Sequence, residues 1–303
     1  MATTMSLAWI VVLAQLAGAC AAKRPPSTVE TTTALVALQT RIVGTLSGDA
    51  EIRPGVKIAN RTTPENRLEA RTYLAKVLTQ SGLTPERQAY SAEGENVYAM
   101  LSCGRPSAEL VVVGAHYDSS RGSPGANDDA TGVAAVAAVA RQLVRVKRRT
   151  RDVAFVFFDE EERGLRGSRA FAQWLKDEKR AVHSVHTIDQ MGWDQDGDRA
   201  IELELPYEGA RELYAAGAAA LKMMIQMHVT TEAGSDHSAF RRLGFKAVGL
   251  TEEYRNKDTT PFIHRPGDTA NTVEFAYLAS TTRLFTKVIE MLATSQTEPK
   301  PPS

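Results

Sequence analysis

One histidine and three aspartates lie close together in the segment GAHYDSSRGSPGANDDATG (114–132), directly after the apolar run ELVVVGA. Their positions are His116, Asp118, Asp128 and Asp129. Imidazole and carboxylate groups are the ligands of zinc sites that contain no cysteine. A loop of this composition can also be a solvated turn with Asx-type hydrogen bonds. The rest of the chain must decide between these two interpretations.

Further acids and a second histidine follow other apolar runs. The segment DEEERG (159–164) comes directly after DVAFVFF, Asp189 ends HSVHTID, and His264 stands in PFIHRPGDT. Two metal ions about 3.5–4 Å apart need a bridging carboxylate and about two further ligands each. The candidate ligands supplied by the sequence are His116, Asp128, Glu162, Asp189 and His264.

The elements that must position these side chains alternate along the chain. Helical patterns cover 64–80, 131–146, 167–179, 208–226 and 273–294. Strand-like runs are NVYAMLS, ELVVVGA, DVAFVFF, HSVHTID, AIELEL and KAVGLTE. Several runs are apolar throughout, which is typical of strands covered on both faces. We therefore predict an α/β fold, a three-layer sandwich in which helices flank both faces of a mostly parallel mixed sheet. Sites in such sheets form beyond the carboxyl ends of the strands, where the His and acidic residues fall.

Five fragments resemble a known family in their order and spacing. They are GAHYDS…SPGANDDATGVAAV, FVFFDEEERGLRGS, TIDQMG, GSDHSAF and IHRPGDT, which together span nearly all of 95–275. The family is that of the co-catalytic di-zinc aminopeptidases of the bacterial leucyl aminopeptidase type, which are zinc-dependent exopeptidases with a zinc exopeptidase-like fold. The resemblance favours a metal site over a solvated turn.

The resemblance implies two Zn²⁺ ions per chain, held by residues that match the family motifs. His116 and Asp189 would bind one zinc, and Glu162 and His264 would bind the other. Asp128 would bridge the two ions.

Other residues take supporting roles by the same resemblance. Glu161 would be the general base, and Asp118 would accept the ring N–H of His116 and fix its tautomer. The family usually has Gly where Glu160 stands, so the assignment depends on the register of DEEERG; the following Gly-Leu and Gly-Ser pairs select Glu161 and Glu162. Asp236 and His237 match a family segment near the site and would support the ligands or line the pocket. Asp129 is interpreted as a simple turn residue.

The function implied by the resemblance is a metallo-aminopeptidase. A bridging zinc-bound water and the Glu base would hydrolyse N-terminal residues from peptides that have a free N-terminus. Alternatives are a glutaminyl cyclase-like acyltransferase, which uses one zinc, and a catalytically silent binding relative; the full ligand set argues against both. Only 75 residues separate Asp189 from His264, too few for the lid domain of related carboxypeptidases. The 36 basic and 36 acidic residues give no indication of nucleic-acid binding.

The amino terminus predicts export. MSLAWIVVLAQLAGACAAKR holds an apolar run too short to span a membrane but suited to a signal peptide, and LAGAC resembles a degenerate lipobox with Cys20 as the lipidated residue. We expect a signal peptide over 1–19, a tether over 20–30, a catalytic domain over 31–295 and a disordered tail over 296–303. The protein would be periplasmic, membrane-anchored or secreted. The second cysteine, Cys103, would then have no disulfide partner.

Several properties stay open at this level. They are the preferred N-terminal residue, the native metal, lipidation as against plain signal cleavage, and the oligomeric state. The acidic segment DQDGD (194–198) could suggest calcium, but it lacks the acid that closes an EF-hand loop, which favours a solvated turn.

Overall fold

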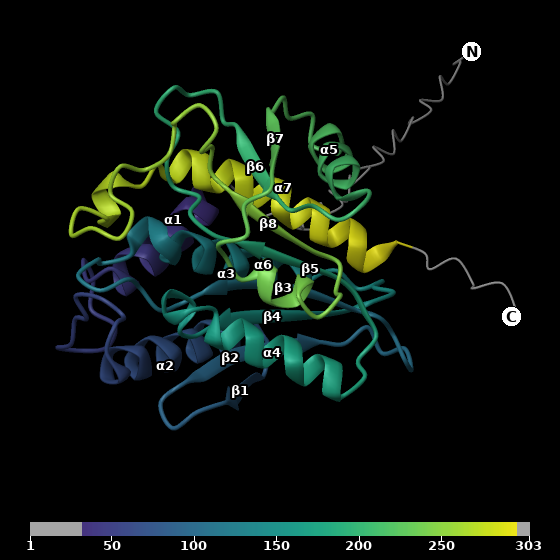
Figure 1. Cartoon of the computed structure of the whole chain (residues 1–303), viewed down its shortest axis with the longest axis horizontal. Helices are drawn as coiled ribbons and strands as arrows, with labels where there is room; N and C mark the ends of the chain where they lie inside the picture. Colours follow the sequence, from purple (N-terminus) through teal and green to yellow (C-terminus); the bar gives the residue numbers. More distant parts are fainter. Residues whose placement is uncertain (1–31, 296–303) are drawn as a thin grey trace, which may run out of the picture.

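A computed structural model of the chain describes residues 32–295, and Figure 1 shows how their elements are arranged. The predicted signal peptide (1–19), the tether (20–30) and the tail (296–303) lie outside the described residues. Within the described part, helices pack on a mixed sheet of eight strands in the order β1-β2-β4-β3-β5-β8-β6-β7. The predicted α/β class with a mostly parallel mixed sheet is confirmed.

The central strands of the sheet run parallel. β3 pairs in parallel with β4 and β5, β5 with β8, and β6 with β7. The β1–β2, β2–β4 and β6–β8 pairs are antiparallel. The strands are β1 (Pro85–Ala89), β2 (Glu95–Leu101), β3 (Leu110–His116), β4 (Asp152–Phe158), β5 (Val182–Ile188), β6 (Ile201–Glu204), β7 (Met227–Thr230) and β8 (Ala247–Thr251).

Helices bury both faces of the sheet. The larger core joins one face to residues of α1, α2, α3, α5 and α7, and the smaller core joins the other face to α4 and α6. Alternate residues of β3 point to opposite faces, so Val111 and Val113 enter the larger core and Leu110 and Val112 the smaller one. The helices are α1 (Thr32–Leu46), α2 (Pro64–Gln80), α3 (Gly132–Leu143), α4 (Arg166–Asp177), α5 (Ala210–Ala220), α6 (His237–Arg241) and α7 (Phe275–Thr294).

The predicted boundaries agree closely with the observed ones where sequence signals are strong. Helix α2 covers the predicted range 64–80, because Thr63 caps its first turn through the N–H of Asn66 and Pro64 occupies a first-turn position. The helix predicted over 208–226 is shorter, since Leu221 ends it and Lys222 adopts a positive φ. Four elements were missed, namely α1, α6, β1 and β7. Strand β1 lies at the edge of the sheet and is mostly polar, so it carries no apolar pattern.

Candidate metal centre and active site

The carboxyl ends of the parallel strands bring the predicted ligands to one edge of the sheet. His116 is the last residue of β3, and Asp189 directly follows β5. The 3₁₀ turn η2 (Glu161–Arg163) follows β4, and His264 lies in the segment beyond β8. Asp128 belongs to η1 (Ala126–Thr131), the irregular turn that leads into α3. Segments far apart in sequence therefore converge on one point.

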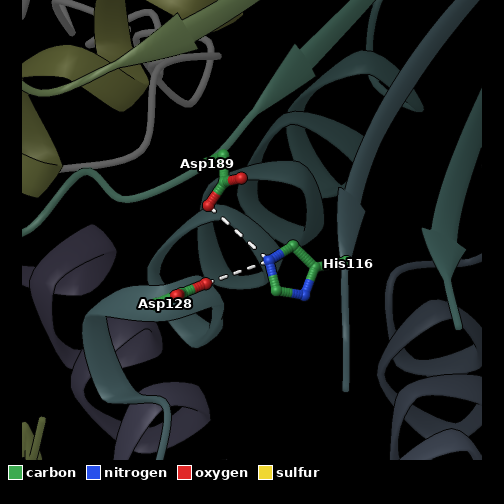
Figure 2. Close-up of side chains that lie close together, drawn as sticks. All are labelled: His116, Asp128 and Asp189. Atoms are coloured by element: carbon green, nitrogen blue, oxygen red, sulfur yellow. Dashed lines mark ion pairs between the residues drawn. The ribbon is translucent and has the colours of Figure 1, made fainter. Parts of the chain in front are cut away.

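His116, Asp128 and Asp189 form the first cluster (Figure 2). His116 Nε2 lies 3.0 Å from Asp128 Oδ1 and 3.6 Å from Asp189 Oδ1. His116 and Asp128 are almost completely buried. One imidazole nitrogen and two carboxylate oxygens thus face a common point, which is the donor set of a His/carboxylate zinc site.

Asp128, Glu162 and His264 form the second cluster. His264 Nε2 lies 3.1 Å from Asp128 Oδ2 and 3.2 Å from Glu162 Oε2. Asp128 therefore directs one carboxylate oxygen to each cluster. The His264 side chain is 54% exposed, so the second cluster opens toward solvent, whereas His116 and Asp128 of the first cluster are buried.

Asp118 connects the histidine to the acidic turn. Its Oδ1 lies 3.3 Å from His116 Nδ1, and its two oxygens accept hydrogen bonds from the backbone N–H groups of Glu161 (3.0 Å) and Glu162 (3.2 Å). The same carboxylate can thus hold the His116 ring with Nε2 toward the first cluster and fix the backbone of the two adjacent glutamates.

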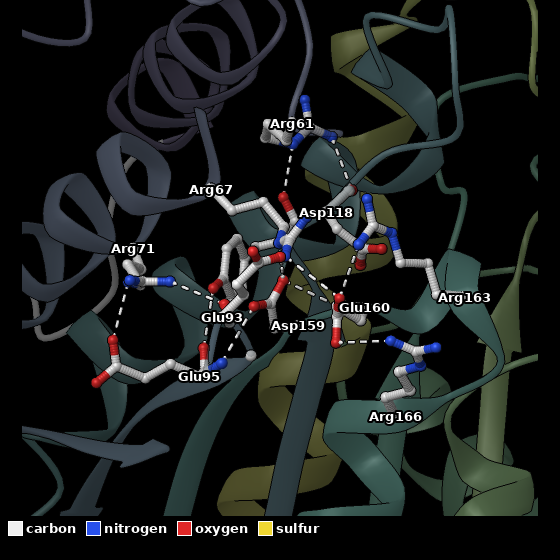
Figure 3. Close-up of polar contacts among 12 residues, drawn as sticks. Arg61, Arg67, Arg71, Glu93, Glu95, Asp118, Asp159, Glu160, Arg163 and Arg166 are labelled. Carbon is white, nitrogen blue, oxygen red and sulfur yellow. Dashed lines mark hydrogen bonds and ion pairs between the residues drawn. The ribbon is translucent and has the colours of Figure 1, made fainter. Parts of the chain in front are cut away.

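Glu160, the extra acid of DEEERG, points into an arginine cluster instead of the metal centre (Figure 3). Its carboxylate pairs with Arg163 (2.9 Å), Arg67 (3.3 Å) and Arg166 (3.5 Å). The neighbouring Asp159 is also buried and pairs with Arg67 at 2.9 Å. The Glu160 carboxylate is therefore paired with arginines, and Glu161 and Glu162 are the acids of this turn that face the site.

The interpretation of Asp129 as a simple turn residue is wrong. Asp129 is completely buried. Its Oδ2 accepts from the backbone N–H of His116, and its Oδ1 accepts from those of Gly132 and Gln190. A β-carbon at Gly132 would lie 2.3 Å from this carboxylate, so glycine is required there. Asp129 thus fixes the ends of β3 and β5 against the turn that carries Asp128.

Three more positioning residues escaped the sequence interpretation. Asp268 accepts hydrogen bonds from the backbone N–H groups of Asn127 (2.7 Å) and Asp128 (3.1 Å). Glu252 accepts from the side chain of Asn127 and from two backbone N–H groups that follow Asp189, those of Gly192 and Trp193. Arg61 is fully buried and donates to carbonyl groups of the loop between β3 and η1, those of Tyr117, Pro124 and Gly125. Only Asp268 lay within a recognised motif, so the sequence held no signal for the other two.

Asp236 and His237 lie at the start of α6, beside the site. Asp236 is buried, and burial raises its pKa to about 7. His237 Nδ1 lies 3.5 Å from Glu204 Oε2, and its Nε2 lies 3.2 Å from the carbonyl oxygen of Glu232. Burial lowers the pKa of His237 to about 4, so the ring is neutral at pH 7. Both residues stand outside the two clusters.

The two clusters bring three carboxyl groups together with only two histidines. Burial raises the pKa of Glu161 to about 10 and that of Glu162 to about 7. Burial opposes ionisation of Asp128 as well, but contacts with His116 and His264 outweigh it and lower that pKa. Glu162 Oε1 and Asp189 Oδ1 are buried and accept no hydrogen bond from residues 32–295. Positive ions would satisfy these oxygens and lower the raised pKa values, so the donor set fits two divalent cations.

A cavity of about 490 Å³ opens over the second cluster. Its walls include the ligand candidates Asp128, Glu162, Asp189 and His264, together with Glu161. The farther walls add three more glutamates, Glu202, Glu204 and Glu232, and the side chains of Tyr254 and Ile263. The lining residues, all within the described range, include no lysine or arginine.

Comparison with known proteins shows the family. The profile of peptidase family M28 matches residues 96–289, which include every residue of both clusters. The chain belongs to peptidase family M28. One relative is the "Probable lipoprotein aminopeptidase LpqL" of Mycobacterium tuberculosis (strain ATCC 25618 / H37Rv). It is 32% identical to this chain over 182 residues, or 55% of this chain. This chain spans only 36% of the length of LpqL.

Solved structures share the fold of this M28 chain. BSAP, "a zinc aminopeptidase from Bacillus subtilis", superimposes with a TM-score of 0.63 at 22% identity, covering 70% of this chain and 53% of BSAP. The glutaminyl cyclase of Porphyromonas gingivalis superimposes with a TM-score of 0.67 at 16% identity, covering 86% and 98%. Both likenesses concern the fold alone. Two different reactions therefore occur on this scaffold, and the residues of the site must distinguish them.

Proposed function

We propose that this M28 protein is a zinc-dependent aminopeptidase that removes residues from the free N-terminus of peptides. The observation that carries the proposal is the position of Asp128. Its two carboxylate oxygens face two different histidines, His116 at 3.0 Å and His264 at 3.1 Å, as a ligand shared by two cations would. The catalytic domain would comprise residues 31–295.

The proposed ligands divide between the two clusters. His116 and Asp189 would bind one Zn²⁺, Glu162 and His264 the other, and Asp128 both. Three observations support zinc: the nitrogen and carboxylate donors, the excess of carboxyl groups over histidines, and the shared fold with BSAP, itself a zinc aminopeptidase. When bound, two zinc ions supply Lewis acidity and lower the pKa of water toward neutrality.

The protein's own residues would carry out the proton transfers and the positioning. Glu161 lines the cavity beside Glu162 and would take a proton from the attacking water, then return it to the departing amine. Asp118 would hold the backbone of Glu161 and the ring of His116 in place.

The charge of the cavity favours the amino end of a peptide over the carboxyl end. Glu202, Glu204 and Glu232 add further carboxyl groups beyond the metal clusters. A C-terminal carboxylate would need an arginine clamp, and none lines the described cavity. Arg265 follows His264 but is exposed and does not line the cavity. The α-amine of an N-terminus therefore fits this site better.

N-acetylation of a peptide is expected to abolish its cleavage, because it removes the basic α-amine. Two peptides identical except for the acetyl group would be incubated with the zinc-loaded protein, and the products followed by mass. The free peptide should lose single residues from its N-terminus. Equal cleavage of both peptides, or loss of C-terminal residues, would contradict an aminopeptidase while leaving a zinc hydrolase intact.

The rival functions predict other products. A glutaminyl cyclase would convert an N-terminal glutamine to pyroglutamate with loss of ammonia and release no amino acid. A silent relative would bind peptides without changing them. The presence of five ligand candidates together with Glu161 supports hydrolysis over both, because a one-zinc cyclase needs no second cluster and a silent relative needs no base.

We also propose that the protein is exported and that Cys20 is the residue to which a lipid is attached. The apolar run before LAGAC supports export, and LpqL is itself described as a probable lipoprotein. None of the helices between residues 32 and 295 is long and apolar enough to cross a bilayer.

Cys20→Ser is expected to move any membrane-bound protein to the soluble fraction of a bacterial host, because the thioether-linked lipid needs the cysteine sulfur. Fractionation and the mass of the mature N-terminus would measure the change. Wild-type protein that keeps Met1 and stays in the cytoplasm would contradict both export and lipidation.

A further inference from the structure

A second group of carboxylates lies outside the metal centre, at the loop between β5 and β6. Oxygens of Asp194, Asp196 and Asp258 lie within 4.8 Å of one another, and so do those of Asp196, Asp198 and Glu253. The first three aspartates of the group come from DQDGD, whereas Glu253 and Asp258 follow β8. Two segments separated by more than fifty residues in sequence thus place four other acids around Asp196.

Glu253 has an oxygen that lacks a partner although the residue is buried. The residue is 2% exposed. Its Oε1 accepts from Asn256 Nδ2 at 2.5 Å and lies 2.9 Å from His228 Nε2. Its Oε2 receives no hydrogen bond from any part of the chain that the structure describes. Leaving a buried carboxylate oxygen unpaired is costly, and a cation shared with Asp196 and Asp198 would give the Glu253 carboxylate the partner that it lacks.

The loop itself is already fixed in shape. Both oxygens of Asp258 accept backbone hydrogen bonds, from Gln195 at 3.1 Å and Asp196 at 3.3 Å. Asp194 Oδ1 accepts from the N–H of Arg199 at 2.9 Å, and Gly197 adopts the positive φ of 77° that the tight turn requires. The ligand candidates are held as well: Asp196 Oδ1 accepts from the N–H of Asp198 at 3.0 Å, and the two oxygens of Asp198 accept from the N–H of Ala200 at 2.7 Å and from Gln226 Nε2 at 2.8 Å.

The acids of the group raise one another's pKa values. Burial raises the pKa of Glu253, and the charges of Asp198 and Asp196 raise it further, while His228 opposes the shift. Burial likewise raises the pKa of Asp194, with contributions from Asp258, Asp198 and Asp196. The negative charges thus repel one another in the described structure.

We propose that Asp196, Asp198 and Glu253 bind one Ca²⁺ ion, at a site separate from the zinc clusters. The available donors are carboxylate oxygens, which hard cations prefer, and Ca²⁺ tolerates the irregular arrangement of loop ligands and waters better than Mg²⁺ does. The sequence lacks an acid that closes the DQDGD loop from within. The fold supplies that acid from beyond β8, as Glu253.

The ion would join two walls of the active-site cavity. Strand β6 begins three residues after Asp198 and contributes Glu202 and Glu204 to the cavity, and β8 contributes Thr251 two residues before Glu253. A cation between these segments would resist their separation. We therefore expect Ca²⁺ to stabilise the folded state.

The test uses the zinc-loaded full chain, freed of Ca²⁺ and titrated with CaCl₂ by calorimetry, with the thermal midpoint measured alongside. Wild-type protein should bind about one Ca²⁺ with a Kd of about 10⁻⁴–10⁻³ M. Its midpoint should rise by about 3–6 °C near 10 mM Ca²⁺. MgCl₂ at the same concentration should give a much smaller shift. Neither readout depends on peptidase activity.

Variants decide whether the proposed residues are responsible. Glu253→Gln and the exposed Asp196→Asn should each weaken Ca²⁺ binding at least about tenfold, whereas Glu208→Gln, an exposed acid on another segment, should bind as wild type does. Asp196→Asn keeps the test valid if the buried variant fails to fold. No Ca²⁺ binding by wild type, or unchanged binding by Asp196→Asn, would overturn the proposal.

Discussion

Glu161→Gln is expected to lower kcat by about 10²–10⁴-fold while both zinc ions remain bound, the usual effect of removing a general base. Glu161 lines the cavity, and Asp118 fixes its backbone through a 3.0 Å hydrogen bond. The amide has the shape of the carboxylate but cannot accept the proton of the attacking water. The measurement pairs steady-state kinetics with zinc content.

Glu162→Gln provides the contrast, because Glu162 Oε2 lies 3.2 Å from His264 in the second cluster. This variant should lose zinc, with activity falling as a consequence. Glu178→Gln, an exposed acid at the end of α4, serves as the control and should keep wild-type activity and zinc. If the Glu161 and Glu162 variants exchange phenotypes, then the assignment of Glu161 as the base and Glu162 as the ligand is wrong.

His264→Ala is expected to reduce bound zinc from about two ions per chain to about one, since it removes the only nitrogen donor of the described second cluster. The thermal midpoint should fall with it, by about 2–5 °C in excess zinc, because a metal that binds only the folded state stabilises that state. Elemental analysis and a thermal melt measure both effects on the same sample.

The neighbouring Arg265→Ala is the matched control. Like His264, Arg265 is an exposed loop residue, but it contributes no atom to either cluster. It should keep wild-type zinc content and stability. A His264→Ala variant with full zinc content and wild-type activity would remove His264 from the site.

Much of the fold follows from local sequence signals. Runs such as DVAFVFF are apolar throughout because helices cover both faces of the sheet, and DVAFVFF coincides with β4. Elements at the edge of the sheet were missed because they are partly exposed and lack such an apolar run. Strand β1 is half exposed and contains Pro85, Glu86 and Arg87, so its structure depends on pairing with β2 and not on its own pattern.

The candidate ligands could be predicted from motifs, but the residues that fix the ligand loops through hydrogen bonds could not. Arg61 and Glu252 act through backbone atoms of loops that are distant in sequence, and nothing in their local sequence marks them. Asp129 was predicted to be a turn residue because its role depends on tertiary contacts. Its three backbone donors come from three different segments, which the local sequence does not reveal. Glu253 shows the same limit: the acid that completes the DQDGD group lies beyond β8, so a local pattern search cannot find it.

The zinc content of purified wild-type protein tests the central claim most directly. The protein would be loaded with excess zinc, desalted and analysed for metal and protein in the same sample. Because both clusters include Asp128, we expect about two zinc ions per chain. Activity should be lost when a chelator removes the zinc and should return when zinc is restored. One ion per chain in active protein, or none, would contradict a di-zinc aminopeptidase.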